Sequence, residues 1–395
     1  MTDVPVRRAR ARAGWIFRPR VRAAIIQIVL VALIGLAGWY IFQTTGQNIA
    51  AQRLVTGFDF FWVESGFSIS QTLIPFSENN TYARAFLVGL LNTLFVSALG
   101  VVLATVIGFL VGIGRLSQNW IISRLCGAYV EIIRNLPLLF QILFWYLAVL
   151  TALPVPRQSI SIFDEIFVNN RGITVPKFVF GEGGGFVFGA AAIGVSLAFV
   201  VSWLARRRTV ATGKPLRVWP LNLALVVGLP MACFLYFGVS VSIDQPVLKG
   251  FNFVGGLRII PEFLALLIAL ATYTAAFIAE IVRAGILAVP RGQTEAASAL
   301  GLRRSKVLRL VVVPQALRVI VPPLTSQYLN LIKNSSLAVS IGYPDLVSVF
   351  AGTTLNNTGQ AIEILGITML VYLCISLVIS FAMNIYNRRI ALKER

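Results

Sequence analysis

The residue types that most often carry chemistry are scarce in this chain of 395 residues. It contains no histidine, which removes the commonest general base and the commonest metal ligand. Its three cysteines, Cys126, Cys233 and Cys374, are isolated and have no metal-ligand spacing. We interpret them as small core residues. The sequence therefore predicts no disulfide, no metal site and no catalytic centre, and the chain is expected not to be an enzyme.

Polar residues inside long apolar stretches are the next candidates, because polar groups are costly in hydrocarbon and normally face a bundle interior or a pathway. Ser326, Asn330 and Asn334 recur every four residues and form one polar helix face. Packing between helices produces similar stripes, so a structural role stays open. The candidates for a solute path are Asn92, Thr93, Gln141, Ser326, Asn330, Lys333, Asn334, Ser335 and Ser336.

Two pairs of opposite charges stand three residues apart near the ends of apolar stretches. They are Glu131 with Arg134, and Glu280 with Arg283. This spacing places both members on one helix face. We interpret each as a solvated ion pair that braces the helices.

The segment 288–314 is amphiphilic and reads as two short helices with a break. Gln293 or Thr294 can begin the first helix, in which Glu295 suits the positive N-terminal dipole. Gly301 permits a left-handed termination, and 303–310 forms a second, basic helix. Such a segment is suited to docking against another protein.

The elements that position these residues are membrane spans. The chain is 57% hydrophobic and 12% charged, against about 25% charged in an average soluble protein. Apolar runs reach the ~20 residues that a helix needs to cross a bilayer. The eight predicted spans are 23–43, 85–113, 129–152, 186–205, 218–240, 262–284, 311–332 and 364–386.

The net charge of +19 is explained by topology. With the N-terminus in the cytoplasm, most of the 34 Lys and Arg residues fall in the N-terminal tail, the C-terminal tail and alternate loops. This is the pattern of the positive-inside rule. It places both termini in the cytoplasm and argues against a nucleic-acid partner.

The segment 288–314 also resembles a known motif. Glu295-Ala296-Ala297 is followed after three residues by Gly301, and after nine more by 311–314, which ends in Pro314. The pattern is similar to the EAA loop of bacterial ABC importer permeases, with Val at the Ile and Leu positions. The resemblance implies that this loop couples the chain to a separate ATPase. The coupling residues so implied are Gly292, Gln293, Glu295, Ala296, Ala297, Gly301 and Pro314.

Further segments look like the polar amino-acid branch of these permeases: 92–94, 134–141, 279–286, 291–293 and 333–337. The resemblance covers 84–151 and 259–388. In its extra segments the chain is similar to the larger permease of general L-amino-acid or glutamate/glutamine/aspartate/asparagine importers. The resemblance implies an all-α polytopic membrane protein with a five-helix permease core, an N-terminal helix and an inserted helical pair.

The corresponding division of the chain follows from the predicted spans. Residues 1–22 form a basic cytoplasmic tail, 23–83 the first span and an outer loop, and 84–152 the first part of the permease core. Residues 153–257 form an outer loop and the inserted helical pair, 258–388 the rest of the core with the coupling loop 289–314, and 389–395 a cytoplasmic tail.

The partners are likewise implied by the resemblance. They are an ABC ATPase dimer, a second identical or homologous permease, a periplasmic or extracellular amino-acid-binding protein and an L-amino-acid substrate, at a bacterial inner membrane. The chain lacks the G-x-x-x-x-G-K-[ST] phosphate loop, so we expect the partner to bind ATP and this chain to hold no cofactor. Lys333 is a candidate for the solute carboxylate and Glu280 a distant one for its ammonium. An ion-coupled secondary amino-acid transporter is the alternative.

Overall fold

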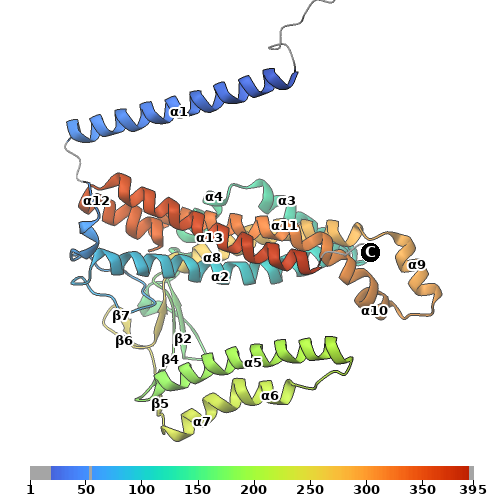
Figure 1. The fold of residues 1–395 in the computed structure, drawn as a ribbon. Coiled ribbons are helices and arrows are strands. Elements are labelled where there is room, and N and C mark those ends of the chain that lie inside the picture. The colour runs from blue at the N-terminus through green and yellow to red at the C-terminus, as the bar shows by residue number, and fades with distance from the viewer. Residues whose placement is uncertain (1–18, 53–55, 391–395) are drawn as a thin grey trace, which may run out of the picture.

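The computed structural model describes residues 19–52 and 56–390. The two predicted tails lie mostly outside them. A central bundle contains the following helices: α2 (Tyr82–Gly114), α3 (Trp120–Asn135), α4 (Leu138–Leu143), α8 (Pro261–Leu287), α11 (Val313–Asn334) and α13 (Ala361–Ile390). Its buried core centres on α8, which contacts α2, α3 and α11 (Figure 1).

Small residues bring α2 and α8 close together. A Cβ atom on Gly108 would lie 2.6 Å from the side chain of Ile278, and one on Gly112 would lie 2.7 Å from the carbonyl oxygen of Ala279. Such close approach is the usual way in which helices associate within a membrane, where lipid supplies no hydrophobic force between them. The glycines of α2 therefore set the distance between the two central helices.

The predicted span 129–152 is broken into two helical parts in the structure. The chain forms α3 and then α4, which continues as a π-helical turn to Leu150, and the two parts meet at an angle of 107°. Pro137 is the physical reason, because proline lacks an N–H and disfavours helical dihedrals in the residue before it. Leu136 is accordingly extended, with ψ of 132°.

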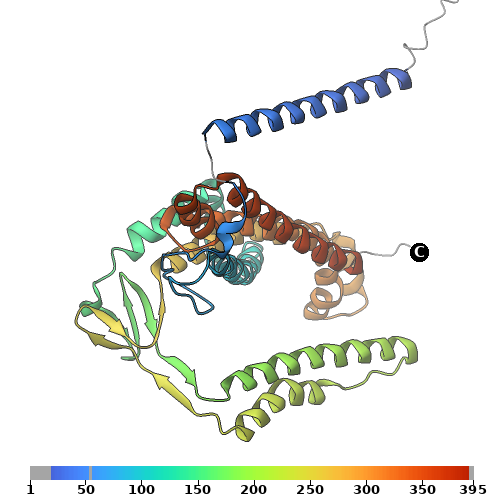
Figure 2. The same ribbon diagram turned by 60° about the vertical axis from the view of Figure 1, so that its left-hand side comes forward.

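Two helical parts lie outside the bundle (Figure 2). The first is α1 (Pro19–Gln52), an apolar helix with exposed side chains such as Ile26 and Val31. The second is the inserted pair, in which α5 (Gly184–Thr212) packs against α6 (Trp219–Leu223), a π-helical turn and α7 (Leu229–Tyr236).

The flanks of the inserted pair form short antiparallel strands that the sequence analysis does not predict. One sheet has the order β1 (Ile160–Ile162), β2 (Ile166–Asn169), β3 (Gly172–Val175), β8 (Leu257–Ile259). Two hairpin-like pairs add β4 (Lys177–Phe180) with β5 (Val241–Asp244), and β6 (Val247–Lys249) with β7 (Asn252–Val254). Each strand has only three or four residues, too few for an alternating pattern to be distinctive.

The predicted helical, polytopic class is confirmed. Within the described residues, seven helices are long and apolar enough to span a membrane, or eight if the bent pair α3–α4 is one span. In Figure 1 the turn at 213–218, the segment 288–312 and the C-terminal end of α13 lie toward one end of the molecule, and the strands lie toward the other. Among the described residues, these three segments, which the sequence places in the cytoplasm, therefore share one end.

Candidate functional site

The segment after α8 projects beyond that end of the bundle as α9 (Arg291–Ala299) and α10 (Arg304–Val307) (Figure 1). The predicted coupling residues Gly292, Gln293, Glu295 and Ala296 are all exposed on α9. Leu300, just after the helix, is 81% exposed.

A small apolar cluster fixes α9 to the bundle. Ala297 is buried together with Val307 and Val312, and Ile286 and Val289 pack against them. The side-chain amide of Gln315 also donates to Gln293 Oε1 at 3.4 Å. The cluster joins the end of α8, the turn after α9 and the start of α11, so a force on α9 would be transmitted to two helices of the bundle.

The turn after α9 is closed as predicted. Gly301 has φ of +74°, its N–H donates to the carbonyl of Ser298, and that of Leu302 donates to Ala297. The left-handed region is open to glycine and costly for other residues. The interpretation of Glu295 as a partner of the helix dipole is wrong, because α9 begins at Arg291 and its first turn holds no acid.

The polar face of α11 lies nearer the opposite end of the bundle. Ser326, Asn330 and Lys333 are exposed along it, whereas Asn334 and Ser336 are half-buried. A cavity of about 500 Å³ opens where α11 ends and meets α13. Its lining residues are Lys333, Ser336, Val347, Thr368, Met369, Tyr372, Leu373 and Ser376.

The residues on the α13 side of this cavity are not among the predicted path residues. Thr368, Tyr372 and Ser376 recur every four residues, which is the same signal that singled out the face of α11. Together with Lys333 they line one cavity, and the hydroxyl of Thr368 already donates to the carbonyl of Ile364 at 2.8 Å. The ammonium of Lys333 supplies a positive charge and N–H donors that suit a carboxylate-bearing solute.

Asn92 and Thr93 are fully buried and bound to another part of the chain. The amide nitrogen of Asn92 donates to the carbonyl oxygens of Gln71 and Pro344. Thr93 Oγ1 accepts from the backbone N–H of Leu346. Both therefore hold the segment that connects α11 to α13, and their prediction as path residues stays a prediction.

Two further predicted path residues also bond to the backbone. Ser335 is fully buried and donates to the carbonyl of Ile332. Gln141 is buried and donates to the carbonyls of Ile133 and Leu136. It thus supplies donors at the bend between α3 and α4, where the helical ladder is interrupted.

Asp345 is a buried acid that the sequence analysis did not single out. It lies between the candidate spans that contain α11 and α13, and its Oδ1 accepts from the N–H of Ser348 at 2.8 Å. Burial raises the pKa of this carboxyl to about 7, against the opposing effect of that hydrogen bond. Among the described residues, its Oδ2 has no hydrogen-bond partner.

The charged pairs near the α9 end differ from each other. The predicted pair of Glu280 and Arg283 is confirmed at 2.5 Å, and Arg115 from the end of α2 binds the same carboxylate. The predicted pair of Glu131 and Arg134 is wrong, since they form no ion pair within the described chain. Arg134 instead lies over the ring of Phe277, 5.0 Å from its centre. Glu280 lies near the C-terminal end of α8 and is already held by Arg115 and Arg283. These contacts argue against it as the partner of the solute's ammonium group.

Known proteins resemble the chain over nearly its whole length. It is 52% identical over 380 residues to a protein of Escherichia coli named as the putative amino-acid ABC transporter permease protein YhdX. The matched region covers 95% of this chain and 96% of YhdX. Residues 218–393 match the model of the family described as binding-protein-dependent transport system inner membrane component. The chain belongs to this family of ABC transporter permeases.

Two more relatives of this permease match end to end. The general L-amino acid transport system permease protein AapQ of Rhizobium johnstonii is 50% identical over 97% of this chain and 96% of its own. The glutamate/glutamine/aspartate/asparagine transport system permease protein BztB of Rhodobacter capsulatus is 45% identical over 96% of both. A solved chain titled as an amino acid ABC transporter with histidines is 23% identical, with a TM-score of 0.47, over 78% of this chain and 95% of its own.

Membership decides several of the sequence expectations. The permease is a multi-pass inner membrane protein and not an enzyme. Its family implies an ATPase partner and a binding protein. The ion-coupled alternative finds no support among these relatives.

Proposed function

We propose that this permease carries L-amino acids across the membrane and forms half of the translocation path. The observation that carries the proposal is the identity of 50% with AapQ over 97% of this chain, because that relative is named as a general L-amino acid permease. YhdX and BztB, which match over similar lengths, are also named for amino acids.

The cavity between α11 and α13 is the best candidate for contact with the solute. Its volume of about 500 Å³ lies within the range of about 300–1,000 Å³ that is typical of small-molecule sites. Lys333 would pair with the solute carboxylate, whereas the hydroxyls of Ser336 and Thr368 already donate to the backbone carbonyls of Lys333 and Ile364. Ser326 and Asn330 extend the same exposed face toward the α9 end, which is consistent with a path along α11.

The exposed α9 would dock in a groove of the ATPase subunit, which binds the ATP. Because one such helix serves one ATPase monomer, the assembly would contain two ATPase subunits and a second permease, identical or homologous. Closure of the ATPase dimer would then drive rigid-body rocking of the two permeases. The apolar cluster around Ala297 supports this role because it links α9 to α8 and α11.

Both termini would lie in the cytoplasm, on the side of α9. The excess of Lys and Arg in the predicted cytoplasmic segments supports this orientation. The strands β1–β8 would then lie on the outer side, where the solute-loaded binding protein arrives. A single cysteine introduced at Ser305 in a chain without its native cysteines tests the orientation, since a membrane-impermeant thiol reagent should label it only in opened cells.

Uptake by the assembled transporter in vesicles tests the solute assignment. Lys333→Ala should reduce uptake of labelled amino acids at least tenfold, whereas Lys249→Ala, which removes an exposed charge from β6, should leave it unchanged. Competition by a panel of amino acids then defines the substrate. Normal uptake and unchanged preference in Lys333→Ala would remove the cavity from the proposal.

Association with the ATPase tests the coupling role separately. Glu295→Arg and Gly301→Asp should abolish co-purification of the ATPase while the chain stays inserted in the membrane. Glu182→Arg, at another exposed acid, serves as the control. Retention of the ATPase by both the Glu295→Arg and the Gly301→Asp variants would overturn the docking role.

A further inference from the structure

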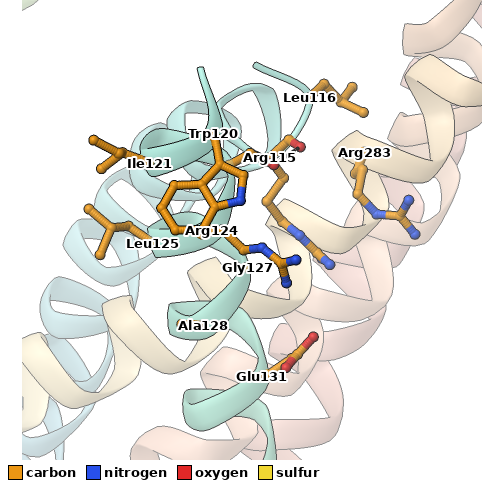
Figure 3. A pocket seen from close by; sticks show the side chains of 11 residues that line it. Arg115, Leu116, Trp120, Ile121, Arg124, Leu125, Gly127, Ala128, Glu131 and Arg283 are labelled. Carbon is orange, nitrogen blue, oxygen red and sulfur yellow. Dashed lines mark hydrogen bonds between the residues drawn. The ribbon is translucent and has the colours of Figure 1, made fainter. Parts of the chain in front are cut away.

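A second cavity, of about 620 Å³, lies at the α9 end of the bundle and has no part in the proposed path. It is bounded by the end of α2, by α3 and by α8. Its charged lining residues are Arg115, Arg124, Arg283 and Glu131. Figure 3 shows the three arginines around the cavity, with Glu131 below them.

The connection between α2 and α3 holds this cavity in shape. Asn119 caps α3 by accepting from the N–H groups of Ile121 and Ile122. The hydroxyl of Ser123 donates to the carbonyl of Arg115 at 3.0 Å. Gly114 lies so close to α3 that a Cβ atom there would be 2.6 Å from Cys126 Sγ. The backbone that carries the arginines is therefore braced from both helices.

The positive charge in the cavity is not balanced. Glu280 accepts from both Arg115 and Arg283, so one carboxylate serves two guanidinium groups. Within the described chain, Arg124 makes no ion pair and no hydrogen bond through its side chain, and neither does Glu131. Each guanidinium has five N–H donors, and most of those around the cavity are unused. A bound anion would satisfy these donors and reduce the repulsion between the arginines.

The rim of the cavity is apolar and faces outward. Trp120 is 71% exposed, and Leu125 is 66% exposed. Ile121 stands one helical turn before Leu125 on the same face and is also exposed. Tryptophan is enriched at the level of lipid headgroups, where its ring is partly apolar and its N–H can bond. A basic cavity with such a rim suits an amphiphilic anion better than a free one.

We propose that this cavity binds the phosphodiester headgroup of an anionic phospholipid. The phosphate oxygens accept hydrogen bonds from Arg124 and from the unused donors of Arg115 and Arg283. The acyl chains lie against Ile121 and Leu125. The lipid comes from the leaflet on the α9 side, which rests on the proposed orientation, and basic pockets between helices on the cytoplasmic side are known to bind such headgroups.

The test uses the full chain in nanodiscs that contain brominated phosphatidylglycerol or brominated phosphatidylcholine at equal mole fraction. Bromine quenches a nearby indole, and subtraction of the Trp120→Phe variant isolates the signal of Trp120. Phosphatidylglycerol should quench Trp120 more strongly than phosphatidylcholine. The measurement involves neither solute nor ATP, so it can fail while the transport proposal stands, or succeed while that proposal fails.

The variants assign the preference to the cavity. Arg124→Ala should lower the relative affinity for phosphatidylglycerol by about fivefold. Arg124→Lys should retain most of it, and Arg206→Ala, which removes an exposed charge from the end of α5, should change nothing. Glu131→Gln should increase the preference, because it removes a negative charge from the lining. If Arg124 and Glu131 had only a structural role, Arg124→Ala and Glu131→Gln would not be expected to change the preference in opposite directions.

Three results would overturn the proposal. They are equal quenching by the two lipids, an unchanged preference in Arg124→Ala, and complete protection of Trp120 from brominated phosphatidylglycerol by millimolar inorganic phosphate. The last result would assign the cavity to a free anion. Thermal unfolding of each variant in the same nanodiscs verifies that it is folded.

Discussion

The side-chain amide of Asn92 donates to the carbonyl oxygen of Pro344, 252 positions away, at 2.9 Å. The same nitrogen donates to the carbonyl of Gln71, so one residue of α2 joins two connecting segments. Tyr343 reinforces the joint by donating from its hydroxyl to the carbonyl of Asn92. The connection between α11 and α13 is thereby attached to α2 and not only to its own neighbours.

Loss of this joint should destabilise the protein. Asn92→Ala leaves two carbonyl oxygens without their donor, which costs about 1–3 kcal/mol for a buried group. We expect a lower midpoint of thermal unfolding in detergent. Asn330→Ala, at an exposed asparagine of α11, is the control. Equal midpoints for the two variants would show that the joint contributes nothing.

The seam between α2 and α8 should not tolerate a methyl group at Gly112. A Cβ atom there would lie 2.8 Å from that of Val282, and overpacking of this kind costs about 1–3 kcal/mol. Gly112→Ala should therefore unfold at a lower temperature. Gly366→Ala, in α13, meets nothing within 4 Å in the described structure and should be neutral or stabilising. The reverse order would contradict the packing of this seam.

The turn after α9 should loosen when its glycine is replaced. Gly301→Ala keeps the composition of the loop nearly unchanged but imposes a cost of about 1–2 kcal/mol on the left-handed residue. That cost corresponds to a factor of roughly 5–30 in the population of open states. Amide hydrogen exchange of 291–299 should be faster by that factor. Gly292→Ala, where φ is not positive, is the matched control and should slow exchange or leave it unchanged.

Stability should depend on pH through Asp345. Its pKa in the folded protein, about 7, is above its ordinary value of 3.8. The folded state therefore favours the protonated carboxyl, and this contribution to stability is present at pH 4 and is lost as the pH rises toward 7. The midpoint of thermal unfolding should fall over this range. Asp345→Asn should flatten the profile, and an unchanged slope would show that another group titrates.

Much of the fold follows from local sequence signals. Apolar length located the spans, and the basic segments around 206–217 and 303–309 indicated which ends belong together. The spacing from Glu295 to Pro314 singled out the exposed segment around α9, and Gly301 marked its turn. These features are local because a helix in a membrane satisfies its own backbone, so each span is defined by a continuous run of residues.

The candidate site was predicted only in part. Ser326, Asn330 and Lys333 share an exposed face of α11, as their spacing indicates. The opposite wall of the cavity, from Thr368 to Ser376, has the same spacing, but no local signal says that it faces Lys333. The strands were missed for a related reason, since Thr174 pairs with Arg258 across the whole inserted helical pair.

The sequence by itself determined that this chain spans a membrane, which of its connecting segments carry an excess of positive charge, and where the exposed segment around α9 lies. Only the tertiary structure decided which polar residues hold the chain together and which remain accessible. Asn92 and Lys333 look alike in the sequence, as polar residues in apolar helices. Asn92 is bound by carbonyls of two distant segments, whereas Lys333 opens into a cavity, and contacts between residues so far apart leave no trace in the local pattern.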